Sequence, residues 1–188
     1  MDFSELNAPA AQVAPRLLGC YLIREMNGQT VTVKIVETEA YHQSDAASHS
    51  YKGRTPRTDI MFGPAGHLYV YFTYGMHYCC NVVTGEEGEG AGVLIRAVEP
   101  LDNVELLEQR RGQSGVAATN GPAKLCQALG ITKQMNGHDL QREPFQLLLQ
   151  PPVSADNVVQ TTRIGISQAK DVPWRFYLKD NPYVSKIT

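Results

Sequence analysis

The chain has 188 residues, which is enough for one domain with a substantial core and only marginally enough for two. Hydrophobic residues make up 43% and charged residues 19%, a composition that describes an ordinary folded protein and excludes an intrinsically disordered one. The formal net charge is -2 and the pI is about 6.2, which argues mildly against a nucleic-acid partner, because strong phosphate binders usually carry a basic surplus. DNA binding would therefore require a local basic patch.

Nothing in the sequence indicates export, a membrane span or a metal site. The acidic start, MDFSELNAPA, lacks the apolar stretch of a signal peptide, and no run of 18 apolar residues is present. The five histidines are scattered and two cysteines are adjacent, which is poor chelate geometry, so we expect no metal and no other cofactor. We expect a cytoplasmic protein of bacterial type, or a nuclear one in a eukaryote, with reduced thiols at Cys20, Cys79, Cys80 and Cys126.

The first third of the chain predicts a short helix, a hairpin and a long loop. Apolar spacing favours a helix over residues 9–18, and the pair Asn27–Gly28 is a strong hairpin signal between predicted strands 20–24 and 30–39. Residues 42–64 are polar and contain glycine and proline, so we expect an irregular loop that is longer than packing alone requires. Loops of that length are usually functional.

The remaining two thirds predict strands with two further helices. The aromatic run HLYVYFTY is strongly β-prone, Gly75 follows it as a turn, and Pro122 suits the first turn of a helix. Hairpins dominate, so we predict an α+β fold: a single compact domain over residues 1–188 with a mainly antiparallel, curved sheet, few helices and long functional loops. The predicted strands are 67–74, 78–83, 93–98, 145–149, 162–166 and 175–178, and the predicted helices are 101–111 and 123–129.

Glu37 and Glu39 are the first candidate catalytic groups. At positions i and i+2 of a strand, two carboxylates stand on one face, about 6–7 Å apart. They continue the face of Val31, Val33 and Ile35, which we expect to turn inward, where a carboxylate is costly without a partner or a task. A solvated strand end fits the pattern equally well. A glycosidase-type acid/base pair fits poorly, because two residues of one strand rarely flank a bond from opposite sides.

Aromatic residues concentrate between positions 41 and 78, beside a basic loop. Such rings stack on nucleobases, and a tyrosine at a hairpin tip can enter a base step. For any single tyrosine, core packing is the simpler explanation, but the density next to the basic loop favours nucleic acid. The group comprises Tyr41, Tyr69, Tyr71, Phe72, Tyr74 and Tyr78 with His42, His49, His67 and His77, and the cations are Lys52, Arg54 and Arg57.

Five ordered segments resemble the alkyladenine DNA glycosylase family, also called methylpurine or 3-methyladenine DNA glycosylases. The segments are ETEAY at 37–41, SHS at 48–50, the block MFGPAGHLYVYFTYGMHYCCN at 61–81, VLIRAVEP at 93–100 and GPAKLCQAL at 121–129. With RFY and NPYVS near the end, the resemblance covers residues 9–187. It implies base-excision repair of double-stranded DNA that contains damaged purines of the 3-methyladenine, 7-methylguanine, hypoxanthine and ethenoadenine class. The resemblance also implies that the base is flipped out and that the N-glycosidic bond is hydrolysed, which would leave an abasic site.

The resemblance assigns the chemistry to two matching positions. Glu39 matches the general base that activates the attacking water, and Arg96 matches the arginine that holds this water and the carboxylate. We expect a structural role for Glu37. Strand alternation puts Lys34, the lysine closest to Glu39 in sequence, on the opposite face, so we predict a monofunctional glycosylase that hydrolyses without lyase activity.

The resemblance also places the flipped base in an aromatic pocket. Two kinds of position match: walls that sandwich the base, and a floor that disfavours the 2-amino group of guanine. A further residue fills the gap that the base leaves in the stack. The walls match Tyr41, His49 and Tyr71, the floor matches Asn81, and the gap-filling position matches Tyr74, with Met76 beside it.

Acidic net charge makes the arrangement of cations important for DNA binding. We expect a monomer without a membrane partner, whose cations gather on the DNA face while the acidic loop GEEGEGAG turns away. Asp59 stands where relatives often carry a basic or amide residue, so one phosphate contact is expected to be lost. Candidates for backbone contacts are Lys52, Arg54, Arg57 and Lys124, with Lys133 as a further one.

Two alternatives remain open at the level of sequence. One is a catalytically inactive module of the same fold that binds damaged nucleic acid; the match at Glu39, Arg96 and Asn81 argues against it. The other is a nucleoside hydrolase, which would have no use for a gap-filling Tyr74 or a basic rim.

Overall fold

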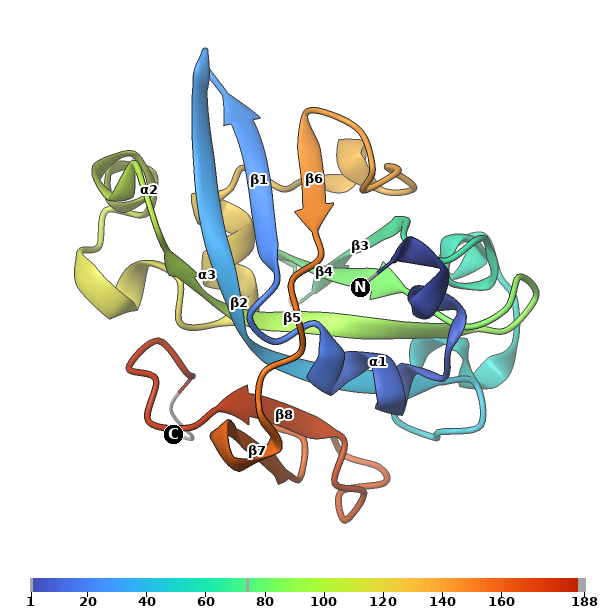
Figure 1. Cartoon of the computed structure of the whole chain (residues 1–188). Coiled ribbons are helices and arrows are strands. Elements are labelled where there is room, and N and C mark those ends of the chain that lie inside the picture. Colours follow the sequence, from blue (N-terminus) through green and yellow to red (C-terminus); the bar gives the residue numbers. More distant parts are fainter. Residues whose placement is uncertain (1, 74, 186–188) are drawn as a thin grey trace.

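Strands dominate the computed structural model, which describes residues 2–73 and 75–185 (Figure 1). The strands are β1 (Tyr21–Met26), β2 (Gln29–His42), β3 (Leu68–Thr73), β4 (His77–Val83), β5 (Ala91–Pro100), β6 (Phe145–Leu148), β7 (Val158–Thr161) and β8 (Arg175–Leu178). They form one sheet of order β3-β4-β5-β2-β1-β6, to which β8 adds along β2 and β7 along β8. Every pair of neighbouring strands among the described residues is antiparallel, which confirms the predicted α+β class.

The helices are short. The α-helices are α1 (Ala10–Arg16), α2 (Val104–Arg111) and α3 (Pro122–Ala128), and 3-10 turns lie at Phe3–Asn7, His49–Lys52, Asp59–Phe62, Gly115–Ala118, Lys133–Met135 and Ala155–Asn157. Pro122 occupies the first turn of α3, where its missing N–H costs nothing. Two 3-10 turns fall within the predicted loop 42–64. None of the helices in the described part of the chain is long and apolar enough to cross a membrane.

One predicted strand is wrong. Residues 162–166 are irregular, and the strand of this region is β7, which ends at Thr161. Gly165 has φ +74°, a left-handed conformation that interrupts an extended strand. Its apolar neighbours Ile164 and Ile166 line a cavity instead of joining a sheet face. The apolar residues of this segment therefore line a cavity and do not form a β-strand.

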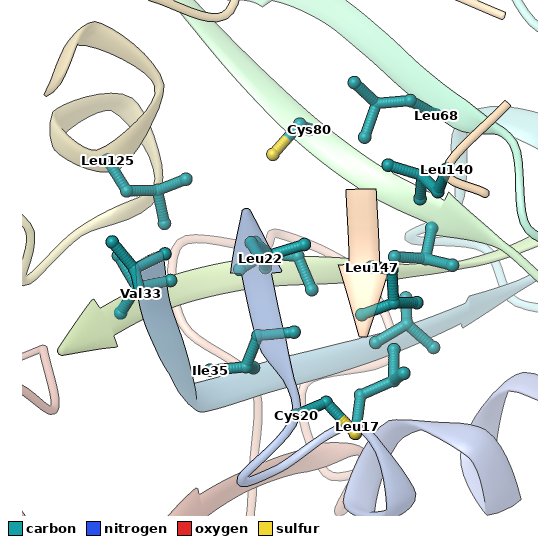
Figure 2. Packing of buried hydrophobic residues seen from close by; sticks show 14 of the residues in the cluster. Leu17, Cys20, Leu22, Val33, Ile35, Leu68, Cys80, Leu125, Leu140 and Leu147 are labelled. Carbon is teal, nitrogen blue, oxygen red and sulfur yellow. The ribbon is translucent and has the colours of Figure 1, made fainter. Parts of the chain in front are cut away.

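A single large hydrophobic cluster joins the sheet to α1 and α3. Leu17 at the end of α1, Ile35 of β2 and Leu125 of α3 are each fully buried in it, and Figure 2 shows such side chains reaching across from different elements. Burial of one such side chain contributes about 1.5–3 kcal/mol relative to leaving it exposed. The cluster fixes the sheet on one face, so the opposite face of the central strands is available for polar groups.

Strand β2 is irregular where it pairs with β5. Between Ile35 and Glu37 the register shifts by one residue, so Val36 is extra in β2. A second shift follows between Glu37 and Thr38 and leaves Arg96 extra in β5. Bulges of this kind re-aim side chains and are common beside active sites. Figure 1 shows β2 as a long bent strand that meets β1 at one end and β8 at the other.

The extra residue changes which side chains of β2 face the core. Ile35 belongs to the hydrophobic cluster before the bulge. After the bulge, Thr38 faces α1, and its Oγ1 donates a hydrogen bond to the carbonyl oxygen of Ala14 at 2.9 Å. Glu37 and Glu39 therefore lie on the opposite face from Ile35. The prediction that they continue its face is wrong, because one inserted residue reverses the alternation.

Candidate active site

A cavity of about 430 Å³ lies against residues of β2, β3, β4 and β5. The segments 46–49 and 164–168 close its sides, so the cavity is built by residues that are far apart in the sequence. Its size falls within the range of small-molecule pockets. The structure brings together six of the predicted site residues in its lining: Glu39, Tyr41, His49, Tyr71, Asn81 and Arg96.

Glu39 is completely buried at the wall of this cavity. Its Oε1 accepts a hydrogen bond from the backbone N–H of Ile164 at 2.8 Å, and its Oε2 accepts one from the hydroxyl of Tyr41 at 2.8 Å. Nη1 of Arg96 lies 3.3 Å from Oε2. An ionised carboxylate offers about four acceptor positions, so three donors hold Glu39 and leave one position for a further donor such as water.

Glu37 is also completely buried, but it is saturated by the protein. It accepts hydrogen bonds from Nε of Arg96 at 3.1 Å, from Nε of Arg175 at 2.6 Å, and from both the N–H and the hydroxyl of Ser185 at 2.7 and 2.9 Å. These contacts support the expected structural role of Glu37. They also place the end of the described chain, Ser185, directly behind the cavity.

Arg96 joins the two carboxylates. Burial alone lowers the pKa of its guanidinium, but the neighbouring carboxylates of Glu39 and Glu37 outweigh burial and raise the pKa above its usual value. Arg96 therefore stays charged. Its Nε binds Glu37 and its Nη1 faces Glu39, so two carboxylates fix the orientation of the guanidinium group. Arg96 also lines the cavity.

Aromatic rings form much of the remaining wall. His49 and Tyr71 meet edge to face with centroids 4.5 Å apart, and Tyr69 stacks beside Tyr71 at 5.7 Å. His49 is exposed at the cavity, yet the protein packed around its imidazole, together with the charge of Arg57, lowers its pKa to about 4. His49 is therefore neutral at physiological pH. Burial and the Glu39 carboxylate raise the pKa of Tyr41, so its hydroxyl keeps its proton for the bond to Glu39.

Asn81 lies on β4 at the base of the cavity and is 4% exposed. Its Nδ2 donates a hydrogen bond to the carbonyl oxygen of Tyr69 at 3.3 Å. This bond fixes the plane of the amide, so that a base in the cavity would meet a polar group of set orientation.

The hairpin between β3 and β4 reaches the rim of the cavity. Thr73 lines the cavity, and Gly75 turns the chain with φ +68°. Tyr74, the predicted gap-filling residue, lies outside the described residues. Met76 is 69% exposed and does not belong to the lining of this cavity. Methionine is among the apolar side chains that DNA-binding proteins insert between base steps.

The predicted backbone cations differ in their surroundings. Nε of Arg54 lies 2.5 Å from the carboxylate of Asp59, and both side chains are more than half exposed. The Arg57 guanidinium lies 5.9 Å from the ring centre of Tyr71, a lining residue, but Arg57 itself is exposed and does not line the cavity. Nζ of Lys124 donates to Asn120 at 2.7 Å. Lys52 is an exposed residue in the last turn of a 3-10 helix.

The argument made from Lys34 does not hold. Lys34 precedes the bulge and points away from the core, so it lies on the same face as Glu37 and Glu39, not on the opposite one. Its Nζ forms an ion pair with Glu99, its cross-strand neighbour, at 2.7 Å. Within the described part of the chain, no lysine lines the cavity.

Several lining residues are absent from the predicted site. Tyr69 was grouped with the aromatic residues but given no role, and Cys79 and the segment 164–168 were not included. Gly165 is the signal that could have identified this segment, since a glycine between two isoleucines is unusual within a strand and indicates an interruption. All four cysteines are free thiols and buried. Among the described residues, no three His, Cys, Asp or Glu side chains are grouped as metal ligands would be.

Comparisons with known proteins identify the family to which the chain belongs. The sequence model of the family described as methylpurine-DNA glycosylase matches residues 4–182. Proteins assigned as 3-methyladenine DNA glycosylases are similar over most of their length: that of Carboxydothermus hydrogenoformans is 54% identical (93% of this chain, 92% of the relative), that of Methanoculleus marisnigri 50% (93% and 92%), and that of Nitrosospira multiformis 48% (99% and 92%). The chain belongs to the methylpurine-DNA glycosylase family.

Proposed function

We propose that this protein excises damaged purines, of the 3-methyladenine, 7-methylguanine, hypoxanthine and ethenoadenine class, from double-stranded DNA. The observation that carries the proposal is the buried carboxylate of Glu39, held by Arg96 and Tyr41 at the wall of an aromatic cavity. Burial of this charge is offset by its three donors, and the acceptor position that they leave open beside the cavity suits a reaction with water. Family membership supplies the class of reaction, cleavage of a base from DNA.

The target base first leaves the duplex. A base inside the stack cannot reach a cavity of this kind, so extrusion costs a few kcal/mol of unstacking, least for a base that already pairs poorly. Tyr41, His49 and Tyr71 would stack against the extruded base. Neutral His49 suits this role, because a positive imidazole would repel a cationic alkylated purine. Tyr74, which matches the family's gap-filling position, would enter the space that the base leaves, with the exposed Met76 beside it.

Hydrolysis then requires a water near the C1′ carbon of the sugar. As the glycosidic bond lengthens, positive charge develops on the sugar ring, and the Glu39 carboxylate stabilises it electrostatically. Glu39 also accepts the proton of the attacking water through its remaining acceptor position, while Arg96 and the Ile164 N–H keep the carboxylate oriented. The products are the free base and an abasic site.

We expect hydrolysis without strand cleavage. A lyase needs an amine that forms a Schiff base with the sugar. The nearby Lys34 is held in an ion pair with Glu99, and the described lining of the cavity is free of lysine. The absence of lysine from the described lining supports the proposal. Alternation along β2 does not support it, because the bulge places Lys34 on the same face as Glu39.

The products of the reaction test the proposal. Duplexes that each contain one of the four lesions named above should release free base and accumulate intact abasic strands. Borohydride should trap no enzyme–DNA adduct. Free deoxyinosine should be turned over far more slowly than deoxyinosine in a duplex. Comparable turnover of the free nucleoside would make this a nucleoside hydrolase, and a trapped adduct would make it a lyase.

A further inference from the structure

Arg163 is a buried arginine beside the cavity to which the sequence pattern assigned no role. Its side chain has no solvent exposure, and it forms an ion pair with Asp45, which is itself 3% exposed in its side chain. Nη1 also donates to the carbonyl oxygen of Ala40 at 3.0 Å, and Nη2 donates to that of Ala169 at 3.4 Å. A buried ion pair is weak evidence for stability, because desolvation offsets much of the attraction. Its position is therefore the informative feature.

The Arg163 guanidinium lies over two aromatic rings. It lies 4.7 Å from the ring centre of Tyr41 and 5.4 Å from that of Trp174. A cation over an aromatic face is attracted by the electron-rich ring, and more strongly when it is shielded from water. Tyr41 is a wall of the cavity and donates its hydroxyl to Glu39. Because the guanidinium covers one face of the Tyr41 ring, the other face is left for a base.

The residue that follows Arg163 reaches the reaction centre directly. The backbone N–H of Ile164 donates to Oε1 of Glu39 at 2.8 Å. Residues 162–169 contain no helix or strand, so no ladder of hydrogen bonds holds this N–H in place. The contacts of Arg163 to Ala40 and Ala169 tie the segment to the end of β2 instead.

Asp45 connects Arg163 to the segment 46–49, which forms another wall of the cavity. Its Oδ1 accepts a hydrogen bond from the N–H of Ala47 at 3.0 Å, while its Oδ2 pairs with Arg163. Ala46 and Ala47 line the cavity. Arg163 therefore touches or adjoins three walls at once: the Tyr41 ring, the segment 46–49 and the segment 164–168.

We propose that Arg163 is a positioning residue, which sets the Tyr41 ring and the Ile164 N–H around Glu39 so that base stacking and water activation share one geometry. The proposal rests on the proposed function of Glu39. Arg163 does not touch the reacting atoms and works through its neighbours. Lysine cannot replace it, because an ammonium keeps the charge opposite Asp45 but has neither the plane that stacks on two rings nor the fork that binds two carbonyl groups.

The test compares R163K with R142K, a matched change of an exposed arginine that pairs with Asp139 and is remote from the cavity lining. With enzyme in excess over a deoxyinosine duplex, the rate constant of base release does not depend on the folded fraction. We expect R163K to lower this rate constant about 10- to 100-fold, since displacement by an ångström costs that much, and to weaken binding of the lesion duplex about 2- to 5-fold. R142K should match the wild type. A wild-type rate constant in R163K would overturn the proposal.

A second variant guards against loss of the fold. D45N/R163Q removes both charges together, so that no unpaired charge stays buried, and it should remain folded. Its rate constant should fall as in R163K. If D45N/R163Q has the wild-type rate constant, then the Arg163–Asp45 pair serves stability alone and the positioning role is wrong.

Two readouts are independent of catalysis and separate this inference from the proposed function. Trp174 is the only tryptophan, so its fluorescence reports the stack on Arg163. The Ile164 amide should exchange its hydrogen faster in R163K than in the wild type, with the core amides of β4 and β5 unchanged. If the wild type releases no base, the proposed function fails, but these readouts still decide the positioning role. An unchanged Ile164 exchange rate and an unchanged Trp174 emission would overturn it.

Discussion

At the scale of single residues, the cavity keeps one potentially cationic group neutral. The imidazole of His49 has its pKa lowered to about 4 by the protein packed around it and by the charge of Arg57. In the unfolded chain the pKa returns to about 6.5. Between these two values the unfolded chain binds more protons than the folded one. The free energy of unfolding therefore falls as the pH drops from about 6.5 toward 4.

His49→Gln should remove this part of the acid sensitivity. We expect the variant to lose about 1 kcal/mol less free energy of unfolding than the wild type between pH 7 and pH 4.5, a modest figure because solvent at the exposed His49 screens the effect. Urea unfolding at both pH values measures it. His77→Gln, on an exposed residue of the hairpin, is the control for loss of a histidine. A variant that loses stability as steeply as the wild type would contradict a lowered pKa.

At the scale of elements, most strands follow from the residue pattern, whereas the faces of β2 do not. The Asn27–Gly28 turn and the aromatic run at 67–74 predicted the hairpins β1–β2 and β3–β4, both of which the structure contains. A prediction from alternation assumes that every residue is paired, however, and the sequence does not reveal that Val36 is an extra residue in the pairing of β2 with β5. That insertion turned the carboxylates away from the core. For the same reason, the prediction that Lys34 lies on the face opposite Glu39 was wrong.

The candidate site could be predicted in part, and mainly through the family resemblance. The residue pattern alone left Glu37 and Glu39 equally open to a solvated strand end. Six matching positions do line one cavity. Arg163 could not be found in this way, because its environment is assembled from β2, the following loop and the segment before β8, and no spacing along the chain links them. Long-range contacts of this kind become visible only once the chain is folded.

At the scale of the whole molecule, the buried charges cancel and leave the acidic balance on the surface. Three carboxylates and three arginines are buried together around the cavity: Glu37, Glu39, Asp45, Arg96, Arg163 and Arg175. Since this set is neutral, the net charge of -2 belongs to the remaining residues. DNA binding must therefore depend on where the surface cations lie, and one of them, Arg54, is engaged by Asp59.

Asp59→Asn should free Arg54 for a phosphate. We expect duplex affinity to rise about 2- to 5-fold at low salt, and the plot of log affinity against log salt to steepen by about 0.9, the value for one added phosphate contact. Glu87→Gln changes the net charge equally on the exposed loop between β4 and β5 and should alter affinity less. Equal gains in both variants would mean that only the overall charge matters, and the Arg54–Asp59 pair would lose its assigned role.

The proposal that a Glu39-activated water cleaves the bond is tested most directly by single-turnover base release in Glu39→Gln. Glutamine keeps the shape of the side chain and can still accept from Tyr41 or Ile164, but it cannot take a proton from water. We predict a fall in the rate constant of about 100- to 10,000-fold, with binding of the lesion duplex still measurable. A rate constant equal to that of the wild type would contradict the mechanism.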